Sequence, residues 1–477
     1  MTNKRKIIND PVYDGFLTIE DDVVFDVLSH PFFQRQRRIK QLGFTCLVYP
    51  GAMHTRFSHM LGALNLMNRA LDVLKVKGIE LTDEEVLGAR LAILMHDIGH
   101  GPFSHTSEHT LIDLPHELCS RLFMERLNNE FGGRLTTAIQ IFDDTYPKHF
   151  LHQLVSSQLD MDRLDYLGRD SFFTGVSEGI VGTDRIINML NVRDDRLVVD
   201  EKGIYSVEKF IISRRLMYWQ VYMHKTVVAA DTLLLNILAR ARELAAQGAT
   251  LGIEATPLYD FLSHHYTLQD FEKDPQLLER FAMIDDSDID CAMKGWMRHE
   301  DKVLSTLSGH LVNRHISAIR VADKPFDPAM IAELQERTQQ LYGIGRHESE
   351  FFVNTGILRN HAYDYNDQEI RVLFKDGTCR DIGDASDQLD RHFLEKQVTK
   401  YYICFPKELI KLRMENYPGA AANSQFSILK SQQIHYECTF YSHWRQRHAQ
   451  SGHRLAPERV SCYRLRRRDF RPSPRPT

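Results

Sequence analysis

The sequence predicts a mainly α-helical protein with a small C-terminal α+β lobe. Over residues 31–244 and again over 257–342, apolar residues recur at three- and four-residue steps between short interruptions by Gly, Pro or Asp. Beyond residue 345 the pattern changes to short apolar runs rich in β-branched and aromatic residues, which favour strands. We therefore expect a helical core over residues 1–344 and a lobe over residues 345–415.

Two helices of the predicted core carry histidines at informative places. His59 falls in the first turns of an amphipathic helix. Residues 86–95 form an apolar run that we interpret as a buried helix, and Gly99, Gly101 and Pro102 end it. His96 and Asp97 therefore stand where a buried helix opens into a tight turn.

A third helix brings Asp162 and Tyr166 onto one face, because the two residues are four positions apart. The neighbouring carboxylates, Asp160 and Asp165, are expected on a solvated face of this helix.

Further along, residues 196–200 and 203–206 resemble a small hairpin, and residues 207–244 form one long helix. A stripe of aromatic and basic residues follows that helix, and such a stripe more often packs a core than contacts a ligand; its members are Phe210, Arg214, Tyr218, Tyr222 and Lys225.

The acidic residues 285–288 are expected to cap a helix or form a loop. In the lobe, residues 369–374 and 400–405 resemble strands, and Asp376-Gly377 is typical of a hairpin turn after the first. A helix fits between residues 384 and 397.

Residues 416–477 depart from the rest of the chain, because lysine disappears after Lys430 while arginines accumulate. We expect a disordered basic tail; contact with nucleic acid is the functional alternative, and an altered reading frame is another.

The composition indicates a reduced, cytoplasmic protein. The seven cysteines are scattered without a CxxC pair, and neither a signal peptide nor an apolar run long enough for a membrane span is present. The formal net charge of -5 is too small to indicate a polyanionic partner, so an anionic ligand must be held by local cationic clusters.

Three distant helices thus offer the ligands of one divalent ion: His59, His96, Asp97 and Asp162. A lone His-Asp pair is more often a core histidine capped by its neighbour, and it is the other two residues that favour a metal. Imidazole and carboxylate together suit Mn, Fe, Ni or Zn, and the carboxylates also admit Mg, so the ion is not determined.

Extended motifs surround these residues: FQRQRRIKQLG (33–43), YPGAMHTRFSHMLG (49–62), HDIGHGPFSH (96–105), HE (116–117), LDMDRLDYLGRD (159–170) and VYMHK (221–225). With them the chain resembles the HD-domain deoxynucleoside triphosphate (dNTP) triphosphohydrolases, SAM-and-HD-domain-like and bacterial dGTPase-like, without the SAM domain. The resemblance implies an HD-domain core with its metal motifs within residues 50–170, a homo-oligomer (dimer or tetramer), and hydrolysis of dNTPs to deoxynucleoside and inorganic triphosphate.

The resemblance also implies roles for individual residues. His116 would protonate the leaving 5′ oxygen, oriented by Glu117 or Glu108, and His105 is the alternative donor. The residues expected around the triphosphate are Arg56, Arg163, Arg214 and Lys225, and those around the sugar are Gln41, Leu42, Tyr166 and Asp170. His100 and Tyr222 complete the substrate-binding candidates.

Two other functions remain open at this point, namely an HD-type phosphohydrolase acting on another nucleotide or phosphate ester, and a nucleotide- or nucleic-acid-binding scaffold. The motifs do not determine which dNTP is preferred. The acid that precedes the FQR block in the nucleotide-activated branch is absent here, which leaves Arg35 and Arg37 as candidates for an allosteric phosphate.

Overall fold

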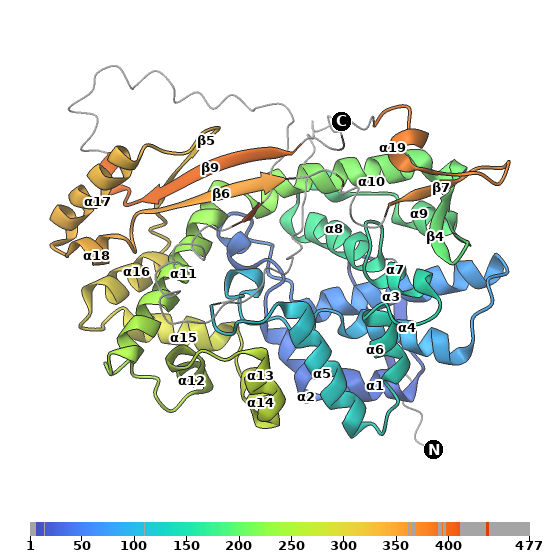
Figure 1. Cartoon of the computed structure of the whole chain (residues 1–477), viewed down its shortest axis with the longest axis horizontal. Coiled ribbons are helices and arrows are strands. Elements are labelled where there is room, and N and C mark those ends of the chain that lie inside the picture. The colour runs from blue at the N-terminus through green and yellow to red at the C-terminus, as the bar shows by residue number, and fades with distance from the viewer. Residues whose placement is uncertain are drawn as a thin grey trace, which may run out of the picture.

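The computed structural model describes residues 6–13, 15–108, 110–360, 363, 369–389, 394, 397–410 and 436–437. Most of them lie in helices, so the mainly α prediction is confirmed (Figure 1). The α-helices are α1 (Asp22–Ser29), α2 (Pro31–Gln34), α3 (Arg56–Val76), α4 (Asp83–Met95), α5 (His116–Glu130), α6 (Thr136–Phe142), α7 (His149–Val155), α8 (Met161–Thr174), α9 (Thr183–Met189), α10 (Ile204–Met217), α11 (Lys225–Ala246), α12 (Pro257–Ser263), α13 (Leu268–Lys273), α14 (Pro275–Ala282), α15 (Asp286–Trp296), α16 (Lys302–Val312), α17 (Pro328–Tyr342), α18 (Arg346–Ser349) and α19 (Ile382–Ala385). Short 3-10 turns, with one π-helical turn (η6), are η1 (Arg35–Arg38), η2 (Gly43–Leu47), η3 (Ser104–Thr106), η4 (Ser177–Gly179), η5 (Glu201–Gly203) and η6 (Tyr218–Tyr222). The strands are β1 (Lys6–Asn9), β2 (Phe16–Ile19), β3 (Leu190–Arg193), β4 (Arg196–Asp200), β5 (Ala318–Ala322), β6 (Asn354–Asn360), β7 (Arg371–Leu373), β8 (Cys379–Asp381), β9 (Val398–Phe405) and β10 (Tyr436–Glu437).

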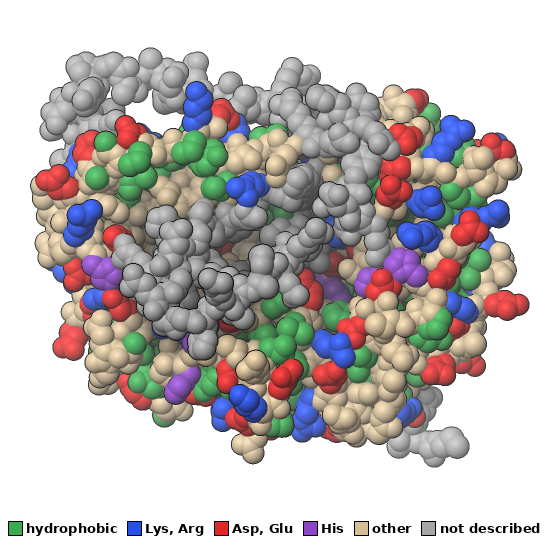
Figure 2. Space-filling model, viewed as in Figure 1, with side chains coloured by type: hydrophobic (Ala, Val, Ile, Leu, Met, Phe, Trp, Pro, Cys, Tyr) green, Lys and Arg blue, Asp and Glu red, His purple; other side chains and the backbone are tan. Residues whose placement is uncertain are grey.

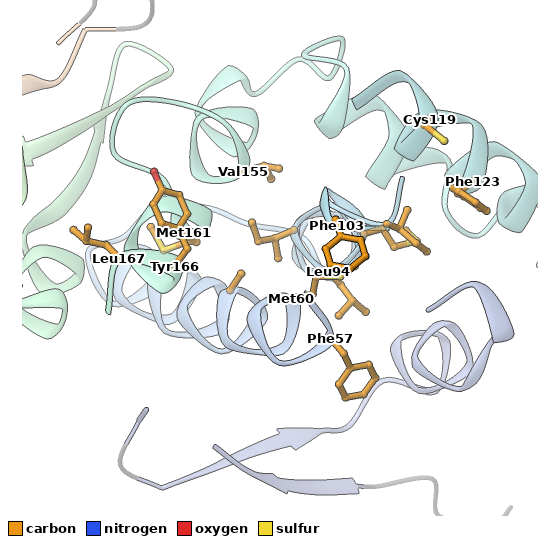
Figure 3. Packing of buried hydrophobic residues seen from close by; sticks show 14 of the residues in the cluster. Phe57, Met60, Leu94, Phe103, Cys119, Phe123, Val155, Met161, Tyr166 and Leu167 are labelled. Carbon is orange, nitrogen blue, oxygen red and sulfur yellow. The ribbon is translucent and has the colours of Figure 1, made fainter. Parts of the chain in front are cut away.

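The helix α3 is the centre of the helical core, where it packs against both α4 and α8. Figure 3 shows buried side chains of all three helices, with Met60 of α3 next to Leu94 of α4, and Leu167 of α8 next to Met161 and Tyr166. The close approach of α3 and α8 requires Gly62, because a Cβ atom there would lie 1.9 Å from Oδ1 of Asp165. The absence of a side chain at Gly62 therefore permits the two helices that carry His59 and Asp162 to approach this closely.

The predicted hairpin exists, but with a different partner strand. Residues 196–200 form β4 as expected, whereas residues 203–206 turn into the start of α10, and β4 pairs with the preceding strand β3. The turn between the strands is Asp194-Asp195, both with positive φ (53° and 57°), which is the geometry of a tight two-residue hairpin.

The single long helix predicted over residues 207–244 is wrong, because the structure divides it. The helix α10 passes into the π-helical turn η6, and α11 begins anew after His224, whose side chain accepts a hydrogen bond from the backbone N–H of Thr226. The apolar pattern continues across the break because both halves bury residues in the same core.

Two four-stranded sheets join segments far apart in sequence. The order β10-β6-β9-β5 is antiparallel throughout, and the order β3-β4-β7-β8 contains a parallel pair, β4 with β7. Residues 318–322 form β5, where a helix was expected, because this segment pairs with β9 as an antiparallel strand at the edge of the sheet. Both sheets therefore combine strands from before and after residue 345.

Other local expectations can be compared with the described residues. Asp285 caps α15 with a capping box, and β7 and β8 pair around the turn at residues 376–377, as predicted. The strand expected at 400–405 is β9. The helix expected over residues 384–397 overlaps α19, which ends at Ala385, and much of the remaining range lies outside the described residues. The predicted tail, residues 416–477, also lies outside the described residues apart from β10.

The surface is mixed in charge. Figure 2 shows basic and acidic side chains interspersed over the face in view, in keeping with the formal net charge of -5. Within the part of the chain that the structure describes, no helix is long and apolar enough to cross a membrane.

Candidate active site and metal centre

Three helices bring the four predicted metal ligands to one buried point. His59 lies in the first turn of α3, His96 and Asp97 directly follow α4, and Asp162 lies in the first turn of α8. None of the four is more than 8% exposed. The position of His96 and Asp97 is well defined because a capping box fixes the start of α4 and most residues of that helix are buried.

The ligand atoms of these residues converge. Nε2 of His59 lies 3.4 Å from Nε2 of His96, and Oδ1 of Asp162 lies 3.0 Å and 3.3 Å from those two nitrogens. Asp97 adds Oδ1 at 3.5 Å from His96 Nε2 and Oδ2 at 3.7 Å from His59 Nε2. Metal–ligand bonds of about 2 Å separate neighbouring ligand atoms by roughly 3 Å, so this spacing fits one ion.

The orientation of the two imidazoles supports the same conclusion. Nδ1 of His59 faces Oδ2 of Asp165 at 2.8 Å, and Nδ1 of His96 faces the carbonyl oxygen of Ile93 at 2.7 Å. In the neutral tautomer that these acceptors favour, each Nδ1 donates outward and each Nε2 presents a lone pair to the other, whereas without an ion the neighbouring carboxylates raise the pKa of both rings against the effect of burial. A cation between them would satisfy both lone pairs, and this is the usual outer-shell arrangement of metal-binding histidines.

The carboxylates of the cluster are held in their ionised form. Burial raises the pKa of Asp162, but the His96 and His59 rings more than reverse this and hold it well below its usual range. Burial also raises the pKa of Asp97, whereas His96 and Arg56 lower it to well below its usual range. Both side chains therefore offer charged oxygen ligands at neutral pH.

The solvated face expected for Asp160 and Asp165 is wrong, because both side chains are buried. Asp160 caps α8 by accepting a hydrogen bond from the backbone N–H of Arg163 at 2.6 Å. Asp165 binds His59, and Arg169 donates to it from Nε at 2.8 Å. Burial raises the pKa of Asp165, but Arg169 and His59 bring it down to about 2. The three-residue spacing from Asp162 is the signal that puts Asp165 beside the site.

Arg56, expected at the triphosphate, contacts Asp97, one of the predicted metal ligands, in the structure. Its Nη1 donates to Oδ2 of Asp97, and its Nε donates to Oγ of Ser104 at 2.8 Å. The side chain is buried, so its charge acts within the cluster.

His116 and Glu108 form a pair next to the cluster. Oε1 of Glu108 lies 2.9 Å from Nδ1 of His116 and also accepts the backbone N–H of His116 at 2.9 Å. Glu117 lies on the other side of the ring, with Oε1 3.4 Å from Nε2. Burial lowers the pKa of His116, but Glu108 and Glu117 raise it to about 9. The imidazole is therefore protonated at neutral pH.

His100 connects this pair to the predicted ligands. Its ring stacks on that of His116 with centroids 3.9 Å apart, and its Nε2 lies 3.3 Å from Oδ1 of Asp97. Burial, Arg56 and His116 hold the pKa of His100 well below its usual range, so a neutral ring separates the two centres.

The loop between the two centres has an unusual backbone. Phe103 and Ser104 both have positive φ (53° and 54°), which costs energy for residues other than glycine. Asp286 stabilises the turn by accepting the backbone N–H of Phe103 at 2.7 Å. His105 follows in η3, and its side chain lies outside the described part of the chain. Strain of this kind is common where a functional side chain must be aimed.

The predicted sugar-binding residues are joined by a histidine that the sequence reasoning missed. Nε2 of His54 lies 2.6 Å from Oδ1 of Asp170, which is fully buried, and its ring stacks on Phe173. The carbonyl oxygen of His54 accepts the backbone N–H of Gln41 at 3.0 Å. His54 stands within the block 49–62, five residues before His59, but no local periodicity links it to Asp170.

Tyr166 and Leu42 lie close to these groups in different ways. Tyr166 is buried one turn after Asp162, with its ring centroid 6.4 Å from that of His59. Leu42 is half-buried immediately before η2.

The remaining candidates for substrate binding lie at different distances from the buried cluster. Arg163 donates from Nε to Oδ2 of Asp160 at 3.1 Å. Arg214 of α10 donates from Nη1 to the carbonyl oxygen of Gln158 at 3.0 Å, so both guanidinium groups lie near the start of α8. Lys225 is exposed at the start of α11, outside the buried cluster, and Tyr222 is half-buried in η6. The break at Met223 and His224 separates Lys225, but not Tyr222, from the helix that carries Arg214.

The suggestion that Arg35 holds an allosteric phosphate is wrong. Its guanidinium is buried and donates to the carbonyl oxygens of Ile284 at 2.8 Å and His100 at 2.9 Å. It therefore stabilises the loop that contains His100 through a backbone hydrogen bond. Arg37 lies over the ring of Phe57, 3.5 Å from its centroid.

The chain matches two family models. The HD domain matches residues 56–157 and the HD associated region matches residues 181–256. The HD match includes three of the four clustered ligands and ends before Asp162, which the fold brings to the others.

Comparison with individual proteins extends the match. The chain is 35% identical to the uncharacterized protein YwfO of Bacillus subtilis over 86% of this chain and 94% of that protein. A phosphohydrolase from Bacteroides thetaiotaomicron of known crystal structure is 50% identical and superposes with a TM-score of 0.81 over 84% of this chain and 99% of that one. The human deoxynucleoside triphosphate triphosphohydrolase SAMHD1 is 28% identical over 50% of this chain, which spans 44% of SAMHD1.

Proposed function

Since this chain belongs to the HD-domain phosphohydrolase family related to SAMHD1, we propose that it hydrolyses deoxynucleoside triphosphates to deoxynucleoside and inorganic triphosphate in a metal-dependent reaction. One observation carries the proposal. His59, His96 and Asp162 form one compact group of ligand atoms with Asp97 beside it, and Asp97 contacts His100, whose ring stacks on the protonated ring of His116, the partner of Glu108.

The cluster supplies the electrophilic half of the site. When bound there, a divalent ion polarises a phosphoryl oxygen and lowers the pKa of a coordinated water. The protein side chains hold that centre rigid, because both histidines are oriented by hydrogen bonds from Nδ1 and the carboxylates are buried and charged. Arg56 adds a fixed positive charge beside Asp97.

His116 supplies the proton. Breaking the bond between phosphorus and the 5′ oxygen leaves an alkoxide, which needs a proton to depart. His116 carries one at neutral pH, and Glu108 fixes its ring through Nδ1. A positioned donor of this kind contributes about 10²- to 10⁴-fold to a rate.

Sugar recognition is proposed for residues of α8 that follow Asp162. Tyr166 packs its ring beside His59, and the His54–Asp170 pair presents a buried carboxylate two turns after Asp162 on α8. In a deoxyribonucleotide site, a ring there would fill the space of a 2′ hydroxyl, and the carboxylate would accept a hydrogen bond from the 3′ hydroxyl.

The test of the reaction is product identity. Protein stripped of metal would be incubated with each dNTP and with Mn²⁺, Mg²⁺, Fe²⁺, Ni²⁺ or Zn²⁺, and the products separated by anion exchange. Inorganic triphosphate with the free deoxynucleoside supports the proposal. Orthophosphate would indicate a different phosphohydrolase, and binding without turnover would indicate a scaffold.

Replacing Tyr166 with alanine is expected to relax the choice of sugar. Removing the ring opens the space that a ribose hydroxyl needs, so the ratio of GTP to dGTP turnover should rise, with some loss of dGTP turnover. Tyr166→Phe is the matched control, because it keeps the ring and should keep rejecting GTP. Equal turnover of GTP and dGTP by the wild type would contradict this role.

A further inference from the structure

The turn of the N-terminal hairpin contacts the outer shell of the metal cluster. Between β1 and β2, Tyr13 donates from its hydroxyl to Oδ1 of Asp165 at 2.7 Å. Asp10 accepts two hydrogen bonds from Arg169, at 3.2 Å from Nη1 and 2.6 Å from Nη2. Arg169 in turn binds both oxygens of Asp165. Residues 10–13 thus reach a network more than 150 positions away in sequence.

That network ends on a predicted metal ligand. Asp165 accepts from Tyr13 and Arg169 on one side and faces Nδ1 of His59 at 2.8 Å on the other. The side chains of Asp165 and Arg169 are completely buried, and that of Asp10 is only 12% exposed. A buried carboxylate is stable only when paired, so its partners control where it lies and how strongly it holds the imidazole.

The packing of α3 leaves room for this network and for nothing larger. A Cβ atom at Gly62, one turn beyond His59, would lie 1.9 Å from Oδ1 of Asp165 and 2.1 Å from Nη2 of Arg169. Only a residue without a side chain fits at position 62 while Asp165 and Arg169 form their ion pair. The pair is a built feature of the contact between α3 and α8.

We propose that the N-terminal segment 10–13 is a positioning element of the metal centre, in which Tyr13 and Asp10 set the metal affinity of His59 through Asp165 and Arg169. The inference rests on the proposed metal site. Tyr13 keeps Asp165 aligned with the ring. Asp10 balances the charge of Arg169, which otherwise opposes a bound cation.

The test is metal affinity, measured by calorimetric titration of chelator-stripped full-length protein with Mn²⁺ and with Co²⁺. We expect Tyr13→Phe to weaken binding about 2- to 10-fold, the factor that corresponds to one lost hydrogen bond. Asp10→Asn should weaken it in the same direction. Tyr146→Phe is the matched control, because it removes a tyrosine–carboxylate bond, to Oε1 of Glu85 at 3.1 Å, in another part of the molecule.

A mutant cycle identifies the route. In an Asp165→Asn background, which should itself weaken binding about 10- to 100-fold, Tyr13→Phe should have little further effect, because its partner is already altered. Unchanged affinity in Tyr13→Phe and Asp10→Asn, with weakened affinity in Asp165→Asn, would overturn the role of the N-terminal segment alone. A wild type that binds neither ion would overturn the proposed metal site and this inference with it.

Discussion

Asp162→Ala should lose the bound divalent ion and all measurable turnover while keeping its helical fold. Asp162 supplies the carboxylate oxygen closest to both Nε2 atoms, at 3.0 Å from that of His59 and 3.3 Å from that of His96. Without it, two histidines and Asp97 remain, and Asp97 is shared with Arg56. Elemental analysis after purification in Mn²⁺ measures the loss, and far-ultraviolet circular dichroism checks the fold.

Asp160→Asn is the control for Asp162→Ala. Asp160 is also buried at the start of α8, but it accepts backbone hydrogen bonds from Ser157 and Arg163 and caps the helix. Asparagine is a good capping residue, so this variant should keep the helix and a full metal content. Stoichiometric metal in Asp162→Ala would show that the ligand assignment is wrong.

His116→Ala should bind metal and nucleotide normally and turn the nucleotide over about 10²- to 10⁴-fold more slowly. The ring is the protonated group of the pair with Glu108, and it contacts Glu117 and stacks on His100. Single-turnover kinetics with equal metal content in both proteins measures the effect. A near-normal rate would transfer the role to His105 or to metal-bound water.

The pH profile gives an independent check on His116. Its pKa is raised to about 9, so the donor is present at neutral pH and is lost as the pH rises through about 9. The wild-type rate should therefore fall on the alkaline side near pH 9. Glu108→Gln removes a charge that raises this pKa, so the fall should move to lower pH. An unmoved profile would exclude proton donation by His116.

Most of the helical elements could be predicted because they depend on neighbouring residues. The apolar spacing of α3 and α4, and the Asp-Gly turn between β7 and β8, each reflect interactions within a few positions of the chain. The positions of His59, His96, Asp97 and Asp162 on three helices followed from the same patterns. Their convergence was expected from their shared ligand chemistry and from the family resemblance, since no local pattern links the three helices.

Errors occurred where distant segments compete with local preference. Residues 318–322 are a strand because β9 is beside them, and 203–206 are helical because β3 already occupies the edge of β4. Asp165 resembles a surface acid in sequence, yet Arg169, Tyr13 and His59 surround it.

The helical class and the chemical types of the site residues could be read from the amino-acid sequence, since they depend on spacing and capping along the chain. The pairing of buried charges depends instead on how distant segments pack: Arg56 with Asp97, His54 with Asp170, and Arg169 with Asp10. A buried charge takes whichever opposite charge the packing brings within hydrogen-bond distance, and that distance depends on how α3, α8 and the N-terminal hairpin meet.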